Sequence, residues 1–172
     1  MSEDQFDLPD GWAWKTLGAV CSKPQYGYTT RASKVARGPK FVRTTDLKTN
    51  GVNWDSVPYC EEPPADLEKY KLDDGDILIS RAGSVGKAFR VVNPPNAIFA
   101  SYLIRFRATQ AQDKYVEHFL QSRAYWDQVE ESTAGITIPN INAQKLSAIE
   151  IPVAPLGEQQ RIVAKIDQLF GE

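Results

Sequence analysis

Three short runs of β-branched and aromatic residues follow one another closely in the middle of this chain. They cover Ile77 to Ile79, Ala88 to Val92 and Ile98 to Phe106, and each is bounded by Gly, Pro or Asn. Runs of this length and composition between turn-forming residues are typical of β-strands. A further run, Phe41 to Leu47, predicts another strand. The chain is therefore expected to fold into a sheet-rich body.

Helical patterns lie in the second half of the chain. From Asp113 to Val129, apolar residues return every three to four positions, which predicts a helix with one face packed on the sheet-rich body. A short helix is expected around Gln144 to Leu146, and the segment IEIPVAP after it is extended because residues before proline avoid the α region. A last helix, from Gly157 to Glu172, follows a proline and is expected to leave the body. Together these patterns predict an α+β fold.

Length and composition exclude several classes of protein. The 172 residues fit one domain, no apolar run approaches the ~20 residues that span a bilayer, and the acidic start has no apolar signal segment. Cys21 and Cys60 are far apart and the single histidine is His118, which argues against a disulfide framework or a zinc site. A soluble cytoplasmic protein that binds no metal is expected.

The charges are segregated along the chain although the formal net charge is only -2. Residues 23–48 carry seven Lys and Arg and one acid, a net of +6, and residues 81–107 carry five cations and no acid. Between them, residues 49–76 carry eight acids and two lysines, a net of -6. If the two basic segments meet on one face, that face offers a positive field for a phosphate backbone. Solvated loops without a partner are the alternative.

The first basic segment carries both kinds of side chain that bind duplex DNA. Cations suit the phosphates, whereas Arg, Asn, Gln, Ser and Thr suit the edges of the bases. We assign this segment to a DNA-binding face. Its candidate DNA-binding residues are Tyr26, Tyr28, Thr29, Thr30, Arg31, Lys34, Arg37, Lys40, Arg43, Thr44, Thr45 and Asp46.

The segment RAGSVGK, residues 81–87, resembles the start of a nucleotide-binding loop. A Walker A loop needs a glycine where this chain has Arg81 and a hydroxyl where it has Ala88, so nucleotide binding is not expected. Arg81, Ser84 and Lys87, with free N–H groups near the two glycines, instead suit a nucleic-acid phosphate. The alternative is a tight turn whose glycines only permit positive φ. Further along, Thr137, Asn140 and Asn142 either read bases or cap the next helix.

Four segments in order carry a resemblance to a known family. They are LPDGWAWKTLGAVC, FVRTTDLK, KLDDGDILISRAGSVGKA and IPNINAQKLSAIEIPVAPLGEQQRIVAKIDQLF, and they extend over nearly the whole chain. Together they resemble the specificity subunit of type I restriction-modification systems. The usual last motif has a proline where this chain has Ala154 and an alanine where it has Gly157, departures that do not disturb the start of the helix.

The resemblance implies a target recognition domain over residues 1–154 and the start of a conserved helical spacer over residues 155–172. Such a subunit performs no chemistry and needs no cofactor. Each of its two recognition domains reads one half of a split DNA site, while separate modification subunits methylate adenine and restriction subunits cut. This chain matches one half of such a subunit. It is either part of a longer subunit or a natural half-subunit that pairs with itself.

The last helix carries an apolar stripe with little chain left to cover it. The stripe has the 4-then-3 spacing of a heptad seam at Ile162, Ile166 and Leu169, and it also includes Phe170. It therefore either packs on its own domain or meets a partner helix. By the resemblance, that partner belongs to a second copy or to the rest of a full subunit.

Two rival functions were considered. The triplet Asn93-Pro94-Pro95 resembles the base-holding motif of adenine-N6 methyltransferases, but Asn96 stands where the aromatic residue should be and no glycine-rich cofactor loop follows an early strand. We therefore interpret the two prolines as a hairpin turn. A module that binds an acidic protein with its basic face is the other rival.

Overall fold

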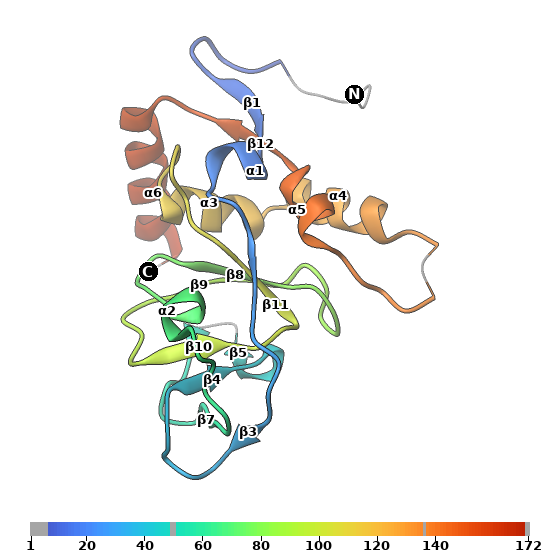
Figure 1. The fold of residues 1–172 in the computed structure, drawn as a ribbon. Helices are drawn as coiled ribbons and strands as arrows, with labels where there is room; N and C mark the ends of the chain where they lie inside the picture. Colours follow the sequence, from blue (N-terminus) through green and yellow to red (C-terminus); the bar gives the residue numbers. More distant parts are fainter. Residues whose placement is uncertain (1–6, 49–50, 136, 171–172) are drawn as a thin grey trace.

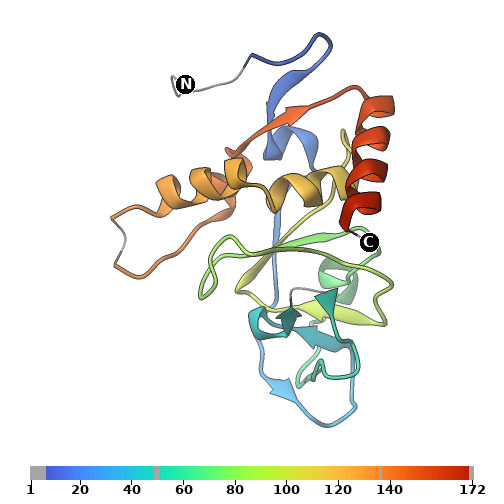
Figure 2. The same cartoon turned by 180° about the vertical axis from the view of Figure 1, so that it is seen from behind.

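The computed structural model describes residues 7–48, 51–135 and 137–170, and they are arranged in three layers. Helices cover one face of a central four-stranded sheet, and a second, lower four-stranded sheet lies on the other side (Figure 1). The view from behind shows the same order, with the strands of the lower sheet farthest from the helices (Figure 2). The predicted α+β class is confirmed.

The central sheet has the strand order β2–β11–β8–β9, and all neighbours are antiparallel. Ile79 and Ile104, which pair across β8 and β11, pack in the core under the helices, whereas Leu78 and Leu103 pack in the core toward the lower sheet. Because both faces are covered, β8 and β11 are apolar at three of their four positions instead of alternating. The strands are β2 (Gln25–Tyr26), β8 (Ile77–Ser80), β9 (Ala88–Arg90) and β11 (Leu103–Phe106).

The helical layer is tied together by a two-stranded antiparallel sheet of β1 (Ala13–Thr16) and β12 (Glu150–Val153). Tyr125, fully buried in this layer, donates a 2.6 Å hydrogen bond to the Gly86 carbonyl and so fixes the layer to the β8–β9 hairpin. None of the helices in the described ranges is long and apolar enough to cross a membrane. The helices are α1 (Leu17–Val20), α3 (Asp113–Leu120), α4 (Arg123–Thr133), α5 (Ala143–Ser147) and α6 (Leu156–Phe170).

The lower sheet has the strand order β10–β4–β7–β3, in which β10 and β4 are parallel and the other pairs are antiparallel. A separate two-stranded sheet, a 3-10 turn and a short helix complete this part. Its elements are β3 (Ala32–Ser33), β4 (Lys40–Val42), η1 (Thr44–Asp46), β5 (Leu47–Lys48), β6 (Gly51–Val52), β7 (Tyr59–Cys60), α2 (Leu67–Tyr70) and β10 (Ala97–Phe99).

Two predicted strands are interrupted. The run from Phe41 to Leu47 is a strand only as far as Val42, because the Asp46 carboxylate accepts the Arg43 backbone N–H at 2.8 Å and closes a 3-10 turn. The run from Ile98 to Phe106 is two strands, β10 in the lower sheet and β11 in the central sheet, joined by a turn at residues 100–102. The prolines at 94 and 95 therefore link two sheets, and the hairpin expected there is wrong.

The helix predicted from Asp113 to Val129 is two helices, α3 and α4, because Ser122 interrupts the pattern. Its hydroxyl accepts the Tyr125 N–H at 3.3 Å and caps the start of α4. Serine favours such caps over helix interiors because its hydroxyl competes for backbone groups. Both helices still bury one apolar face, as predicted.

The last helix was expected to leave the body. That expectation is wrong for one face of α6, which packs along α3. Gln159, 2% exposed, accepts the Gln112 N–H at 2.9 Å and donates to the Ala154 carbonyl at 2.8 Å. One turn from the end, Asp167 forms a 2.8 Å ion pair with Lys114 of α3. These polar links hold both ends of α6 against the helical layer. Residues 171 and 172 of the predicted helix lie outside the described ranges.

The apolar stripe of α6 is divided between the domain and its surface. Ile162 packs at the edge of the main core and Ile166 is half-buried, whereas Leu169 and Phe170 are 64% and 76% exposed. Both alternatives for the stripe thus apply to different residues: the first two pack on their own domain, and the last two are largely exposed in the described part of the chain.

Candidate nucleic-acid interface

The second basic segment does not form an open positive face, because three of its five cations lie in ion pairs. Arg105, 8% exposed, lies 3.7 Å from the Asp76 carboxylate and donates to the Lys71 carbonyl at 2.6 Å. Arg107 bonds Asp76 at 2.6 Å and Asp73 at 2.7 Å. Arg90 pairs with Asp113 in the same way. Asp73 and Asp76 of the intervening acidic stretch, together with Asp113 beyond it, therefore pair with three of these cations, and of this segment only Arg81 and Lys87 form no ion pair within the described residues.

The pKa values of Arg105 and Arg107 are shifted in opposite directions. Burial lowers the pKa of Arg105, which Asp76 only partly offsets. The hydrogen bond from Asp76, by contrast, raises the pKa of Arg107. Both guanidinium groups stay charged because the ordinary arginine pKa is far above neutral, so Asp76 is the anion that balances buried positive charge.

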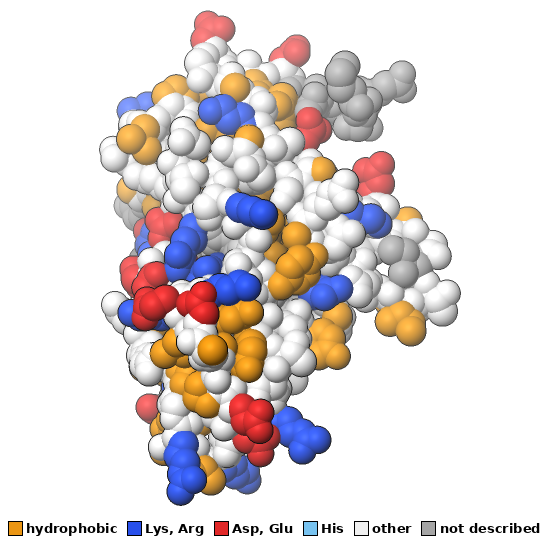
Figure 3. All heavy atoms as spheres, in the orientation of Figure 1, with side chains coloured by type: hydrophobic (Ala, Val, Ile, Leu, Met, Phe, Trp, Pro, Cys, Tyr) orange, Lys and Arg blue, Asp and Glu red, His pale blue; other side chains and the backbone are white. Residues whose placement is uncertain are grey.

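The first basic segment leaves five cations at the surface, Lys23, Arg31, Lys34, Arg37 and Lys48, and three of them lie close together in the sequence. Arg31, Lys34 and Arg37 are exposed, and no acidic side chain of the described ranges forms an ion pair with them. They lie in and beside β3, at the end of the molecule farthest from the helices (Figure 1). In the space-filling view, Lys and Arg side chains gather at this end and recur across the middle of the same face (Figure 3). We call Arg31, Lys34 and Arg37 the β3 cations.

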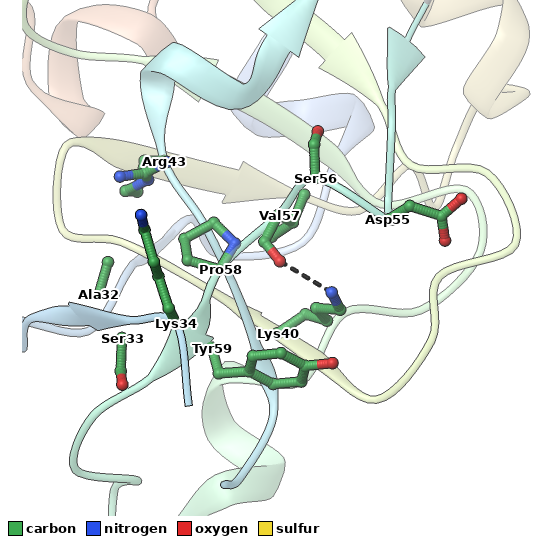
Figure 4. Close-up of a pocket in the computed structure, with 10 residues that line it drawn as sticks. All are labelled: Ala32, Ser33, Lys34, Lys40, Arg43, Asp55, Ser56, Val57, Pro58 and Tyr59. Atoms are coloured by element: carbon green, nitrogen blue, oxygen red, sulfur yellow. Dashed lines mark hydrogen bonds between the residues drawn. The ribbon is translucent and has the colours of Figure 1, made fainter. Parts of the chain in front are cut away.

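A hollow of about 420 Å³ lies beside the β3 cations, between β3, β4 and the segment before β7. Lys34 and Arg43 extend toward one another on one side of it, and Asp55 lies on the other (Figure 4). The Lys40 ammonium, also on its wall, donates to the Val57 carbonyl at 2.8 Å and lies 4.3 Å from the centre of the Tyr59 ring. Of the two lysines that line this hollow, Lys40 is bonded, whereas the Lys34 ammonium has no bonding partner among the described residues.

Arg43 and Asp46 satisfy one another. The guanidinium forms two bonds to the carboxylate, at 3.0 and 2.9 Å, and this hydrogen bonding raises the pKa of Arg43. Thr44 and Thr45 lie in the same turn, half-buried and exposed respectively. The compact polar set expected here is present, but its positive charge is balanced internally.

The loop between β8 and β9 is a tight turn. Gly83 and Gly86 have φ of 77° and 83°, and the Gly86 N–H donates to the Ser80 carbonyl at 2.8 Å. The expectation of a free N–H at Gly86 is therefore wrong, because the turn uses it. Lys87 donates to the Leu47 carbonyl at 2.8 Å, while Ser84 at the tip is exposed. Positive φ, the alternative interpretation of these glycines, is confirmed.

The polar residues of the loop before α5 have different surroundings: one caps the helix and two are exposed. Asn142 accepts the Lys145 N–H at 2.8 Å and caps α5, so its side-chain oxygen has a structural partner. Asn140 is exposed and forms a β-bridge with Ala82, which places this loop beside the end of β8. Thr137 is exposed as well.

The two tyrosines around Gly27 have different surroundings. Tyr28 packs against Tyr70, with 5.2 Å between ring centres and the ring planes tilted by 51°, and borders the small core of the lower sheet. Tyr26 is 37% exposed, and its hydroxyl accepts the Ala143 N–H at 2.9 Å. The Arg81 guanidinium carbon lies 5.2 Å from the centre of the Tyr26 ring. The structure thus brings Tyr26 and Arg81 together, although 55 positions separate them in the sequence.

Sequence reasoning missed Tyr102, which is 61% exposed beside this pair. The Arg81 N–H donates to the Tyr102 carbonyl at 2.9 Å. Tyr102 lies within the run from Ile98 to Phe106, whose composition predicted one continuous strand. Its neighbour Ser101, polar in an apolar run, was the signal of a turn.

Solved structures share this fold. The HsdS subunit of Thermoanaerobacter tengcongensis is 26% identical and superposes with a TM-score of 0.73 over 99% of this chain and 40% of that one. The S subunit of the type I restriction-modification system of M. genitalium is 16% identical, with a TM-score of 0.65 over 94% of this chain and 40% of its own. The layered body and its C-terminal helix are thus those of specificity-subunit structures.

The sequence places the chain in the same class. Residues 9–172 match the model of the type I restriction modification DNA specificity domain, and the chain belongs to that family. It is 24% identical to the specificity subunit of the type I restriction enzyme EcoAI of Escherichia coli, over 98% of this chain and 30% of that subunit. With the StySPI specificity subunit of Salmonella potsdam it is 28% identical, over 96% and 37%. The chain spans about a third of the length of these relatives.

Proposed function

We propose that this chain reads one half of a split DNA site for a type I restriction-modification complex. In this proposal residues 1–154 form the target recognition domain and residues 155–172 begin the helical spacer. The family supports DNA recognition, and the distribution of charge supports its location. In the described residues most arginines outside the first basic segment are paired with acids, whereas the β3 cations are exposed and unpaired.

The chain acts in this proposal as an adaptor without chemistry of its own. It holds the modification subunits at the DNA and, through them, the restriction subunit, so methyl transfer and cleavage belong to those partners. Its relatives are specificity subunits of type I restriction enzymes, which supports this division of roles. In this proposal the complex acts on cellular DNA, so the chain works in the cytoplasm.

The β3 cations supply the test of the DNA-binding face. In the complex with modification subunits, Lys34→Ala and Arg37→Ala should each weaken binding to all duplexes alike, since phosphates carry no sequence information. Each should also lower the slope of log K against log salt by about 0.9, because one fewer counterion is released. Fluorescence-anisotropy titrations of a labelled duplex at several salt concentrations measure both quantities.

The matched control for these variants is Lys15→Ala. Lys15 is also exposed, but it lies on β1 at the opposite end of the molecule (Figures 1 and 2). It should leave both affinity and salt slope unchanged. A complex in which Lys34→Ala and Arg37→Ala behave like Lys15→Ala would show that DNA does not lie along β3.

The exposed end of α6 is proposed to meet a partner helix. Leu169→Asp should weaken concentration-dependent self-association, because it places a charge on the uncovered apolar stripe. Burial of such side chains contributes roughly 1.5–3 kcal/mol each before association costs, so a dimer of moderate strength is expected. Sedimentation equilibrium measures it, with Gln168→Asp, exposed one position earlier, as the control of equal charge. A strict monomer before any substitution would refute self-pairing through this helix.

A further inference from the structure

Arg81 occupies a place in the central sheet that sets it apart from the other unpaired cations. It directly follows β8, and its N–H continues the ladder to β11 through the Tyr102 carbonyl. Tyr26 lies on β2, the strand on the other side of β11. The contact between the Arg81 guanidinium and the Tyr26 ring therefore crosses the whole width of β11. The arginine is extended across the sheet and lies over it.

The guanidinium of Arg81 is held without being neutralised. Its Nε is buried and has no hydrogen-bond partner among the described residues, and no carboxylate there pairs with it. The backbone on both sides is fixed, because the Arg81 carbonyl accepts the Ile141 N–H at 3.0 Å. A buried donor without a partner costs free energy unless a ligand supplies an acceptor. Because Nε is inaccessible, an acceptor from outside would have to bond the terminal N–H groups of this guanidinium, which is held in place with its charge unbalanced by any described carboxylate.

The Tyr26 ring under Arg81 is itself anchored at two points. Its strand pairs with Ile104 of β11, and its hydroxyl is bonded to the Ala143 N–H at the start of α5. An arginine over such a ring gains a cation–π interaction and loses rotational freedom. Tyr26 therefore acts as a platform that directs the guanidinium.

The unpaired cations thus fall into two kinds. The β3 cations are exposed, and such long side chains can follow a phosphate wherever it lies. Lys87 is bound to the Leu47 carbonyl. Lys40 also lies over a ring, that of Tyr59, but its ammonium is bonded to the Val57 carbonyl. Arg105 lies over the Phe99 ring but pairs with Asp76. Arg81 combines a place over an aromatic ring with the absence of any ion pair among the described residues. Bidentate reading of a guanine edge uses two donors in a set direction, and a fixed guanidinium presents them with less loss of conformational freedom than a mobile ammonium.

We propose that Arg81 reads a guanine in the major groove and that Tyr26 is its positioning residue, while the β3 cations bind phosphates. This inference rests on the proposed DNA-reading function and assigns roles within it. The exposed Tyr102 and Asn140 border the same spot and limit the bases that can approach it.

The test uses the complex of this chain with its modification subunits and a pool of duplexes randomised over the recognised half-site. Arg81→Gln should move the preference at one base pair from guanine toward adenine, because glutamine matches adenine. Binding to the original site should fall about 5- to 150-fold, while binding to unrelated duplexes and the salt slope stay unchanged. Tyr26→Phe, which keeps the ring but loses the hydroxyl anchor, should weaken the same preference without creating a new one.

The control is Tyr70→Phe on α2, the same change at a half-buried tyrosine outside the proposed reading site, which should leave the base preference intact. Thermal melting of each variant separates loss of folding from loss of reading. A lower salt slope and equal weakening on all duplexes for Arg81→Gln would make Arg81 a phosphate contact and overturn the inference. An unchanged preference for both Arg81→Gln and Tyr26→Phe would overturn it too. If the unsubstituted complex itself prefers no sequence, the proposed function fails instead.

Discussion

Gly27→Ala is expected to prevent stable folding of the recognition domain. A Cβ atom at this position would lie 2.1 Å from the Ala100 carbonyl oxygen and 2.6 Å from that of Phe99. Both contacts are with backbone, which cannot rotate aside. The neighbouring N–H groups are already bonded there, Gly27 to Leu103 at 3.1 Å and Tyr28 to Phe99 at 2.8 Å. The segment must therefore leave the sheet to accept a methyl group.

The expected loss for Gly27→Ala is more than about 4 kcal/mol of unfolding free energy, in the range reserved for severe backbone or core disruption. Urea unfolding followed by tryptophan fluorescence measures it. Gly157→Ala is the control, since nothing lies within 4 Å of its added Cβ on the exposed face of α6, and alanine in a helix should stabilise by about 0.5–1 kcal/mol. A Gly27→Ala protein as stable as the original would mean that the strand crossing at Ala100 is looser than the structure shows.

Asp76→Asn is expected to have the second largest effect. Asp76 is 3% exposed and lies between Arg105 and Arg107, so its loss leaves the buried Arg105 charge uncompensated. Removing one partner of a buried pair costs about 3–5 kcal/mol, because the remaining charge stays out of water. For a chain of this size the melting temperature should fall by roughly 6–20 °C. Calorimetry measures the change directly.

The matched control for Asp76→Asn is Asp127→Asn. Asp127 is 61% exposed and pairs with Arg123, itself 92% exposed, so water replaces the lost interaction and little change is expected. Equal melting temperatures for the two variants would contradict the assignment of Asp76 as the central anion of the sheet. Because Asp76 is buried and pairs with Arg105 and Arg107, not with the β3 cations, its effect on DNA affinity should follow the fraction of folded protein.

Several elements were predictable from the sequence because their signals are local. The strand from Ile77, the cap at Asn142 and the stripe on α6 each follow from residues within a few positions of one another. The breaks were less visible. The turn at Ser101 and Tyr102 and the cap at Ser122 interrupt patterns that remain apolar on either side, so periodicity continued through them.

The sequence by itself determined the α+β class, the segregation of charge and the family resemblance, since all three depend on the order of residue types. Which cations stay unpaired was decided only by the tertiary structure. Arg105 and Arg107 meet acids some 30 positions earlier because β11 pairs with β8, whereas Arg81 meets Tyr26 across β11. Charge acts over a few ångströms of space, and distances of that kind between remote segments are set by strand order and register, which no local pattern records.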